Sequence, residues 1–98
     1  MYTVDYFIAK FEAIPDNKWT TGDYVDKNGR KDALGHCGNT VSGGDTDESF
    51  TLRELTVNKF GYTNIIRIND GLAEQVVEEF GESPKERVIN YLRSIKNV

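Results

Sequence analysis

The sequence predicts one small, mostly α-helical domain over residues 1–98, with four to five short helices and a minor β-hairpin near residues 23–31. The chain has 98 residues, which is an ordinary size for a single domain. Several segments repeat apolar residues at helical spacing, directly behind residues that cap helices. Five Phe, five Tyr and one Trp supply large side chains for a core, so a disordered chain is not expected.

The clearest element is a helix over residues 84–96. Ser83 can cap it, Pro84 suits the first helical position, and Glu86 stands where a capping box places its acid. Cations in the last turns favour the negative end of the helix dipole. The apolar residues that recur at helical spacing are Val88, Ile89, Leu92 and Ile95.

A second helix is predicted over residues 4–13. Thr3 is a suitable N-cap, and Pro15 ends the pattern because the residue before a proline leaves helical backbone space. The apolar stripe consists of Tyr6, Phe7, Ile8, Phe11 and Ile14.

The middle of the chain carries weaker signals. Asn28-Gly29 supplies the positive φ angles of a tight turn, which predicts the hairpin between short, weakly apolar flanks. Glycine stops and capping residues predict helices over residues 33–38, 47–59 and 72–80. Residues 62–69, with three isoleucines, could be helix or strand.

Composition excludes several classes of protein. The net charge is −4 and no basic block occurs, so direct nucleic-acid binding and binding to anionic membranes are not expected. No apolar run is long enough to cross a bilayer, and the N-terminal residues lack the pattern of a signal peptide. These features favour a cytoplasmic protein.

Only one cysteine, Cys37, and one histidine, His36, are present. A disulfide scaffold and a four-ligand zinc site therefore cannot be built within one chain. His36 with scattered carboxylates, such as Asp32 four residues earlier, is weak support for any other metal, so neither a metal nor a cofactor is expected.

Five residues are candidates for a functional site. His36 and Cys37 could form a thiolate pair, although neighbours on a helix point about 100° apart, and a buried cysteine is the commoner outcome. Asp70 is the carboxylate that could complete such a site. Trp19 and Asn69 are candidate binding residues, each with a structural alternative: a core tryptophan whose N–H finds a carbonyl, and an Asn-Asp-Gly turn.

Several short motifs resemble a family of small bacterial and phage proteins of unknown function. The motifs are Trp19-Thr-Thr-Gly22, Gly29-Arg30, Ala33-Leu34-Gly35, Asn69-Asp70-Gly71 and Ser83-Pro84-Lys85-Glu86-Arg87. The chain departs from the pattern at Ile68, where an aromatic residue is common, and at Asp32, where a small residue or cysteine is common. The resemblance implies a helical architecture and a bacterial or phage setting, and it implies no activity.

These observations favour a non-enzymatic interaction or accessory protein that acts through a helical, partly acidic surface. The acidic run near the C-terminus could lie in solvent, meet a basic partner, or mimic the charge of nucleic acid and so block a nucleic-acid-binding protein. The alternative is a small enzyme or ligand-binding domain with a site around His36, Cys37 and Asp70. A homodimer stays open because small domains often gain stability by pairing. The residues of the acidic run are Glu74, Glu78, Glu79, Glu82 and Glu86.

Overall fold

The computed structural model describes residues 1–57 and 65–96, and within these ranges the chain is helical without a β-strand. The mostly helical prediction is therefore confirmed. A 3-10 turn at Asp16–Lys18 follows the first helix. The α-helices are α1 (Val4–Glu12), α2 (Ala33–His36), α3 (Asp47–Leu55), α4 (Ile65–Asp70), α5 (Glu74–Phe80) and α6 (Pro84–Lys96).

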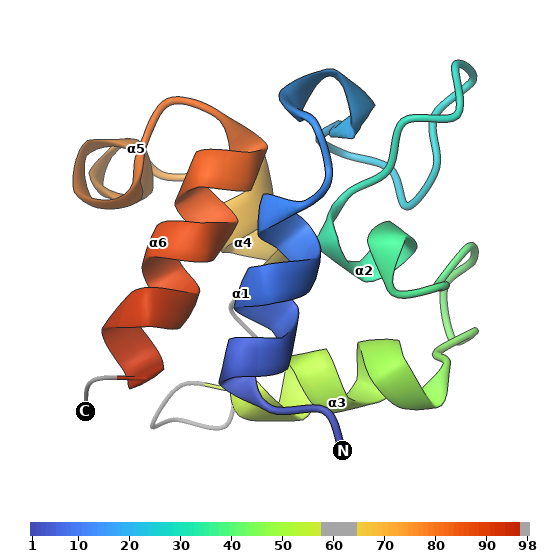
Figure 1. The fold of residues 1–98 in the computed structure, drawn as a ribbon. Helices are drawn as coiled ribbons and strands as arrows, with labels where there is room; N and C mark the ends of the chain where they lie inside the picture. The colour runs from blue at the N-terminus through green and yellow to red at the C-terminus, as the bar shows by residue number, and fades with distance from the viewer. Residues whose placement is uncertain (58–64, 97–98) are drawn as a thin grey trace.

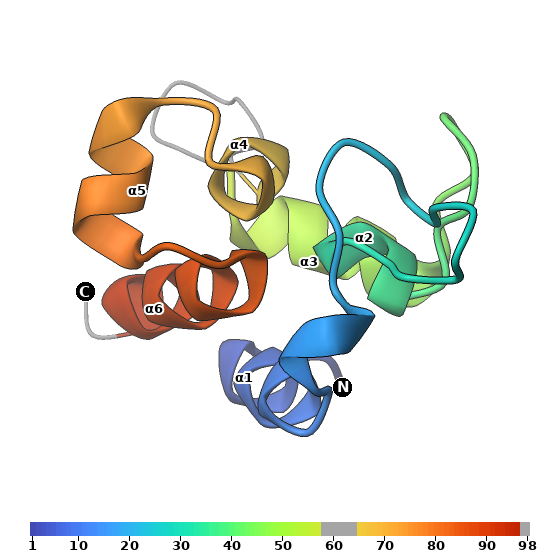
Figure 2. The same cartoon turned by 90° about the horizontal axis from the view of Figure 1, so that it is seen from above.

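Helix α6 organises the packing. It lies beside α1 with the opposite direction, so that α1 begins and α6 ends at the same end of the molecule (Figure 1). Helices α4 and α5 also pack on α6, and α2 joins α4 to α3 (Figure 2). The buried apolar side chains form one cluster. They are Phe7, Ile8, Phe11, Trp19, Ala33, Leu34, Cys37, Leu52, Ile65, Ile68, Val88, Ile89 and Leu92.

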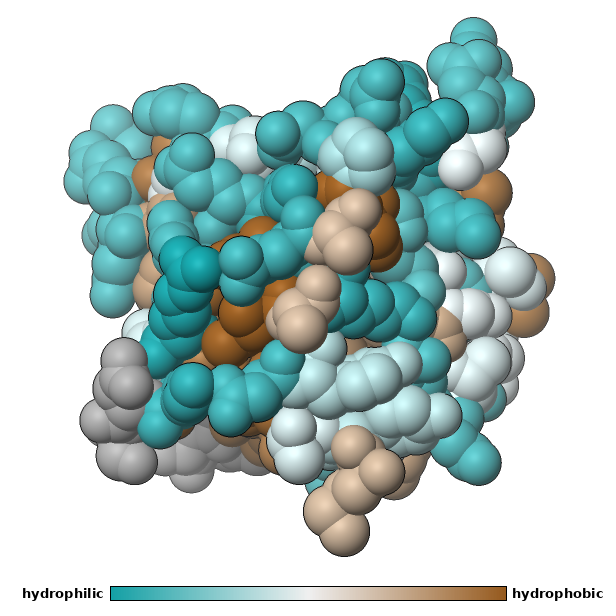
Figure 3. Space-filling model, viewed as in Figure 1, coloured by the Kyte–Doolittle hydropathy of each residue, from teal (hydrophilic) through white to brown (hydrophobic). Residues whose placement is uncertain are grey.

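The two terminal helices form for the reasons expected from their sequence. Thr3 caps α1 by accepting a hydrogen bond from the N–H of Tyr6 (3.1 Å), and Ser83 caps α6 by accepting one from the N–H of Glu86 (3.3 Å). Helix α1 ends one residue before the predicted end, and the bounds of α6 match the prediction. Apolar side chains of α1 and α6 pack against each other, and on the surface they form an apolar strip that polar side chains surround (Figure 3).

The predicted helices at 33–38, 47–59 and 72–80 correspond to α2, α3 and α5, each with shorter bounds. Helix α2 ends before Gly38, whose φ of +96° is readily adopted only by glycine. Helix α3 ends at Leu55, and the predicted residues 58 and 59 lie outside the described part of the chain. The undecided segment 62–69 is helical from Ile65 onward as α4.

The predicted β-hairpin at residues 23–31 was wrong. A turn does form at Asn28-Gly29, but the carboxylate of Asp26 accepts the N–H groups of Asn28 and Arg30, both at 2.9 Å. Beyond the turn, Lys31 pairs with the backbone next to Trp19 and makes only isolated bridges. The flanks lack the alternating apolar residues that hold two strands together, so side-chain and loop contacts replace the ladder.

Arg87 connects α6 to α4 and is only 4% exposed. Its guanidinium donates to the carbonyl of Ile68 from Nε (2.8 Å), to that of Asn69 from Nη2 (2.6 Å) and to that of Gly81 from Nη1 (3.3 Å). Two of these carbonyls belong to the last turn of α4, which has no further helical turn to bond to. A Cβ on Gly71 would lie 3.0 Å from Arg87 Cζ, so this glycine leaves room for the guanidinium. Arg87 thus fixes the end of α4, where Asn69 and Asp70 lie.

Candidate functional site

Asn69 fastens the loop before α2 to the end of α4. Its side chain is 1% exposed, and its Oδ1 accepts a hydrogen bond from the N–H of Ala33 (3.1 Å). Its Nδ2 donates to the carbonyl of Thr20 (3.0 Å) and to Oδ1 of Asp70 (2.9 Å). Three segments of the chain therefore meet at one side-chain amide. These bonds supply the hydrogen-bond partners that a buried amide needs.

Asp70 extends this frame toward the surface. Its Oδ1 also accepts the N–H of Gly22 at 3.1 Å, so the loop after Trp19 lies against the end of α4. Gly22 has a φ of +82°, which favours glycine at this turn. The Asn-Asp-Gly segment is thus a helix end whose two side chains position a distant loop.

Beside this frame lies a cavity of about 340 Å³, at the lower end of the range typical of ligand pockets. Asp32 and Asp70 both line it, and none of the described lining residues is a lysine, arginine or histidine. The lining residues are Gly22, Asp23, Tyr24, Val25, Asp32, Thr40, Ile66 and Asp70.

Asp32 is the most deeply buried charge of the cavity, with 5% of its surface exposed. Its Oδ1 caps α2 by accepting the N–H of Gly35 (2.7 Å). Burial raises the pKa of Asp32 to about 6, and the negative charge of Asp70 adds to that effect. The cap and the charge of Arg53 oppose the shift without cancelling it.

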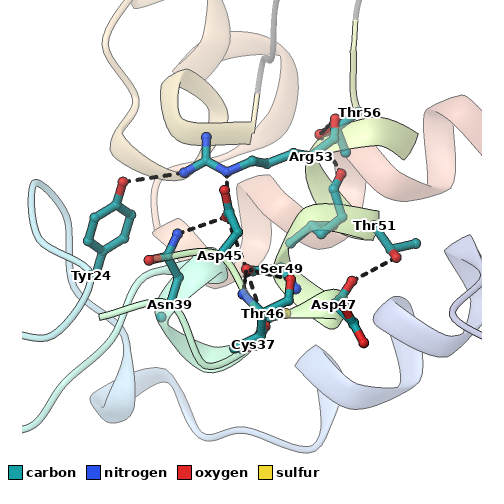
Figure 4. Close-up of polar contacts among 12 residues, drawn as sticks. Tyr24, Cys37, Asn39, Asp45, Thr46, Asp47, Ser49, Thr51, Arg53 and Thr56 are labelled. Carbon is teal, nitrogen blue, oxygen red and sulfur yellow. Dashed lines mark hydrogen bonds and ion pairs between the residues drawn. The ribbon is translucent and has the colours of Figure 1, made fainter. Parts of the chain in front are cut away.

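Tyr24, which lines the cavity, is joined to a polar network that connects α3 with the loops before it (Figure 4). Asp45 Oδ1 accepts hydrogen bonds from Arg53 Nε (2.8 Å), Asn39 Nδ2 (3.0 Å) and Ser49 Oγ (3.0 Å). Burial alone would raise the pKa of Asp45, but the bonds from Arg53 and Ser49 outweigh it and lower the pKa. Arg53 Nη2 also donates to the hydroxyl of Tyr24 (3.3 Å), which fixes the ring at the cavity wall. Arg53 is therefore already paired with a carboxylate outside the cavity.

Trp19 lies in the core and His36 lies half-buried beside it, and neither residue lines the cavity. Their rings meet edge to face with 4.6 Å between centroids, and Trp19 Nε1 donates to the carbonyl of Ile14 (3.3 Å). Burial, helped by the charges of Lys31 and Lys10, lowers the pKa of His36 to about 4. Its Nε2 is buried without a hydrogen-bond partner among the described residues. The half-buried ring of His36 is therefore neutral at neutral pH.

Cys37 is buried, with 3% of its surface exposed. Burial, and to a lesser degree the charge of Glu48, raises the pKa of Cys37 to about 12. A thiol that keeps its proton is a poor nucleophile and a poor metal ligand. The burial of Cys37 and the low pKa of His36 both disfavour a thiolate–imidazolium pair.

We expect Cys37 in the native protein to react with a thiol reagent at pH 8 on the order of a thousandfold more slowly than in the unfolded chain, because almost none of it is thiolate. A stopped-flow absorbance assay measures both rates, one in buffer and the other at a urea concentration well above the unfolding midpoint. Because Cys37 is the only cysteine, the signal has a single source. Native and unfolded rates within tenfold of each other would restore Cys37 as a candidate nucleophile.

The structure brings together a different set of residues from the one predicted. Asp70 lines the cavity and Asn69 holds its frame, whereas Trp19 and Cys37 are in the core and His36 is half-buried against Trp19. Asp32 and Tyr24 were missed as cavity residues, and only tertiary contacts bring them there. Among residues 1–57 and 65–96, no group of three His, Cys, Asp or Glu side chains could hold a metal ion, and no helix could span a membrane.

No protein-family model, curated protein sequence or solved structure matches the chain. The resemblance to bacterial and phage proteins stays a prediction from the sequence.

Proposed function

We propose that the chain is a non-enzymatic interaction protein whose acidic cavity receives a positively charged side chain of a partner protein. One observation carries the proposal: Asp32 and Asp70 line the same cavity, and no cationic side chain is present among its described lining residues. Two neighbouring carboxylates repel each other, and a cation between them relieves both charges at once.

The nearby cations of the chain are committed elsewhere. Arg53 pairs with Asp45, and Arg87 donates to three backbone carbonyls. In the described part of the chain, neither Asp32 nor Asp70 takes part in an ion pair. A partner's lysine or arginine would supply the missing charge, and the net charge of −4 favours the approach of a basic partner.

Other exposed features support an interaction role over catalysis. Phe50 on α3 is 54% exposed, and the carboxylates of Asp47 and Glu54 stand one turn before and after it. All five glutamates of the acidic run from Glu74 to Glu86 are exposed. An enzyme built on His36 and Cys37 stays the alternative, and the burial of Cys37 weighs against it.

The proposal is tested with single blocked amino acids as probes, followed by amide shifts in ¹H–¹⁵N NMR spectra. Acetyl-arginine amide and acetyl-lysine amide should shift residues of the cavity such as Gly22 and Thr40, whereas acetyl-norleucine amide should not. We expect Asp32→Asn and Asp70→Asn each to weaken the binding roughly tenfold, since charge-assisted hydrogen bonds contribute about 1.5–3 kcal/mol. Asparagine can still accept the cap and loop bonds of either aspartate.

Asp47→Asn is the matched control, because it removes one negative charge from the exposed face of α3. This variant should bind the cationic probes as the wild type does. Equal binding of the norleucine probe, or equal weakening by Asp47→Asn, would show that the cavity does not recognise the charge.

A further inference from the structure

We infer that the cation taken up by the cavity is a guanidinium group, so that the site distinguishes arginine from lysine. This inference rests on the proposed function and deepens it. It follows from three features of the cavity: the arrangement of free acceptors, the burial of Asp32 and the aromatic wall.

The first feature is a pair of carboxylate oxygens on separate segments. Asp32 uses Oδ1 for the N–H of Gly35, and Asp70 uses Oδ1 for Gly22 and Asn69. The backbone N–H of Leu34 also stabilises the Asp32 carboxylate, but no side chain of the described residues donates to Oδ2 of either aspartate, and both aspartates line the cavity. A guanidinium directs five N–H groups outward in one plane and can address two separate acceptors, whereas the donors of an ammonium diverge from a single atom.

The second feature is the burial of the acceptor. Asp32 is 95% buried while lining the cavity, so a cation that reaches it must lose much of its water. A guanidinium is more weakly hydrated than an ammonium, so its transfer into such a site costs less free energy. The same burial favours an occupant with a positive charge, because the cap and the charge of Arg53 compensate the Asp32 carboxylate only in part.

The third feature is the wall formed by Tyr24, Val25 and Ile66. The Tyr24 hydroxyl is held by Arg53 Nη2, so the ring is fixed before a ligand enters (Figure 4). A planar guanidinium stacks on an aromatic ring and packs against aliphatic groups. An ammonium can make a cation–π contact with the face of the ring, but it is not planar and cannot stack on the ring.

The experiment compares three blocked tripeptides, acetyl-Gly-X-Gly-amide, in which X is arginine, lysine or citrulline. NMR titration should give roughly tenfold tighter binding for arginine than for lysine, and no binding for citrulline, which has the shape of arginine without its charge. In Tyr24→Leu, we expect arginine to lose most of this advantage while lysine changes little.

The outcomes separate this inference from the proposed function. Equal binding of lysine and arginine overturns the preference for guanidinium and leaves the cationic site in place. Failure of both cationic peptides overturns both proposals. Free arginine and methylguanidine test the source of the group: tighter binding of either one than of the arginine peptide overturns a protein partner and assigns the guanidinium to a small molecule.

Discussion

Replacing Arg87 with methionine is expected to destabilise the protein by on the order of 3–5 kcal/mol, because three hydrogen bonds from a charged donor are lost and each contributes about 1.5–3 kcal/mol. Methionine fills much of the same space but donates no hydrogen bond. The carbonyls of Ile68, Asn69 and Gly81 then lose the donors that Arg87 supplies. Each buried acceptor left without a donor costs roughly 1–3 kcal/mol. Urea unfolding followed by the fluorescence of Trp19 measures the difference.

Arg93→Met is the matched control on the same helix. Arg93 is exposed and pairs with Glu12 at 3.2 Å across the α1–α6 surface, a contact worth less than about 1 kcal/mol. Arg87→Lys should stay close to the methionine variant, because one ammonium cannot reach three carbonyls in a fixed plane. An Arg87→Met loss as small as that of Arg93→Met would mean that Arg87 does not hold the end of α4.

Arg87 also shows where reasoning from the sequence fell short. The sequence analysis names it only within the Ser83-Pro84-Lys85-Glu86-Arg87 motif and assigns it no contact. Its position in the first turn of α6 was a signal, because cations are disfavoured at the positive end of a helix. A tertiary contact explains that placement, because the guanidinium donates hydrogen bonds to carbonyls at the C-terminal, negative end of α4.

The helices were predictable where caps and apolar spacing agree within a few residues. Thr3 and Ser83 fixed the starts of α1 and α6, and Gly81 ended α5. The hairpin failed because a turn signal alone does not supply cross-strand side-chain contacts. Local patterns predict local structure, and the contacts of Lys31 with the backbone beside Trp19 are not local.

The candidate site was predictable only in part, for the same reason. The Asn69-Asp70-Gly71 motif marked a place where polar side chains end a helix, and the structure puts Asp70 at the cavity. Asp32 lies 38 positions earlier and meets Asp70 only because Asn69 holds the loop before α2 against α4. No local sequence pattern indicates that Asp32 and Asp70 lie close together.

The second large effect concerns Asp32 and pH. The ordinary pKa of an aspartate is 3.8, and in the folded protein burial raises the pKa of Asp32 to about 6. At roughly 1.4 kcal/mol for each unit of pKa, the ionised carboxylate costs the folded state on the order of 3 kcal/mol above pH 6. The folded state binds more protons than the unfolded state between the two values, so this cost disappears as the pH falls toward 4.

The protonation of His36 changes the stability of the folded protein in the opposite direction over the same pH range. Its pKa is lowered to about 4 by burial, so below pH 6.5 the unfolded chain takes up a proton that the folded protein refuses. Stability therefore decreases as the pH falls, by less than the roughly 3 kcal/mol that the whole shift would give, because solvent screens the half-buried ring. In the wild type the contributions of Asp32 and His36 oppose each other between about pH 4 and 6.5.

Asp32→Asn should separate the two contributions. We expect the variant to be more stable than the wild type by up to about 3 kcal/mol at pH 8 and pH 7, with the difference falling below pH 6 to roughly half of that value at pH 5. His36→Phe, which keeps a ring against Trp19, should show the reverse dependence and gain stability on the wild type as the pH falls. Urea unfolding at pH 5, 6, 7 and 8 measures both. Parallel curves for wild type and Asp32→Asn would mean that Asp32 has an ordinary pKa.

The expected gain from Asp32→Asn bears on why a charge stands at this position. Asparagine caps a helix as well as aspartate does, so the bond to the N–H of Gly35 requires no negative charge. The carboxylate then weakens the folded state at neutral pH without improving the cap. Such local conflicts with stability are expected at sites kept for binding. A bound cation would remove the conflict, so an arginine peptide should stabilise the wild type more at pH 8 than at pH 5, and should stabilise Asp32→Asn less and by a similar amount at either pH.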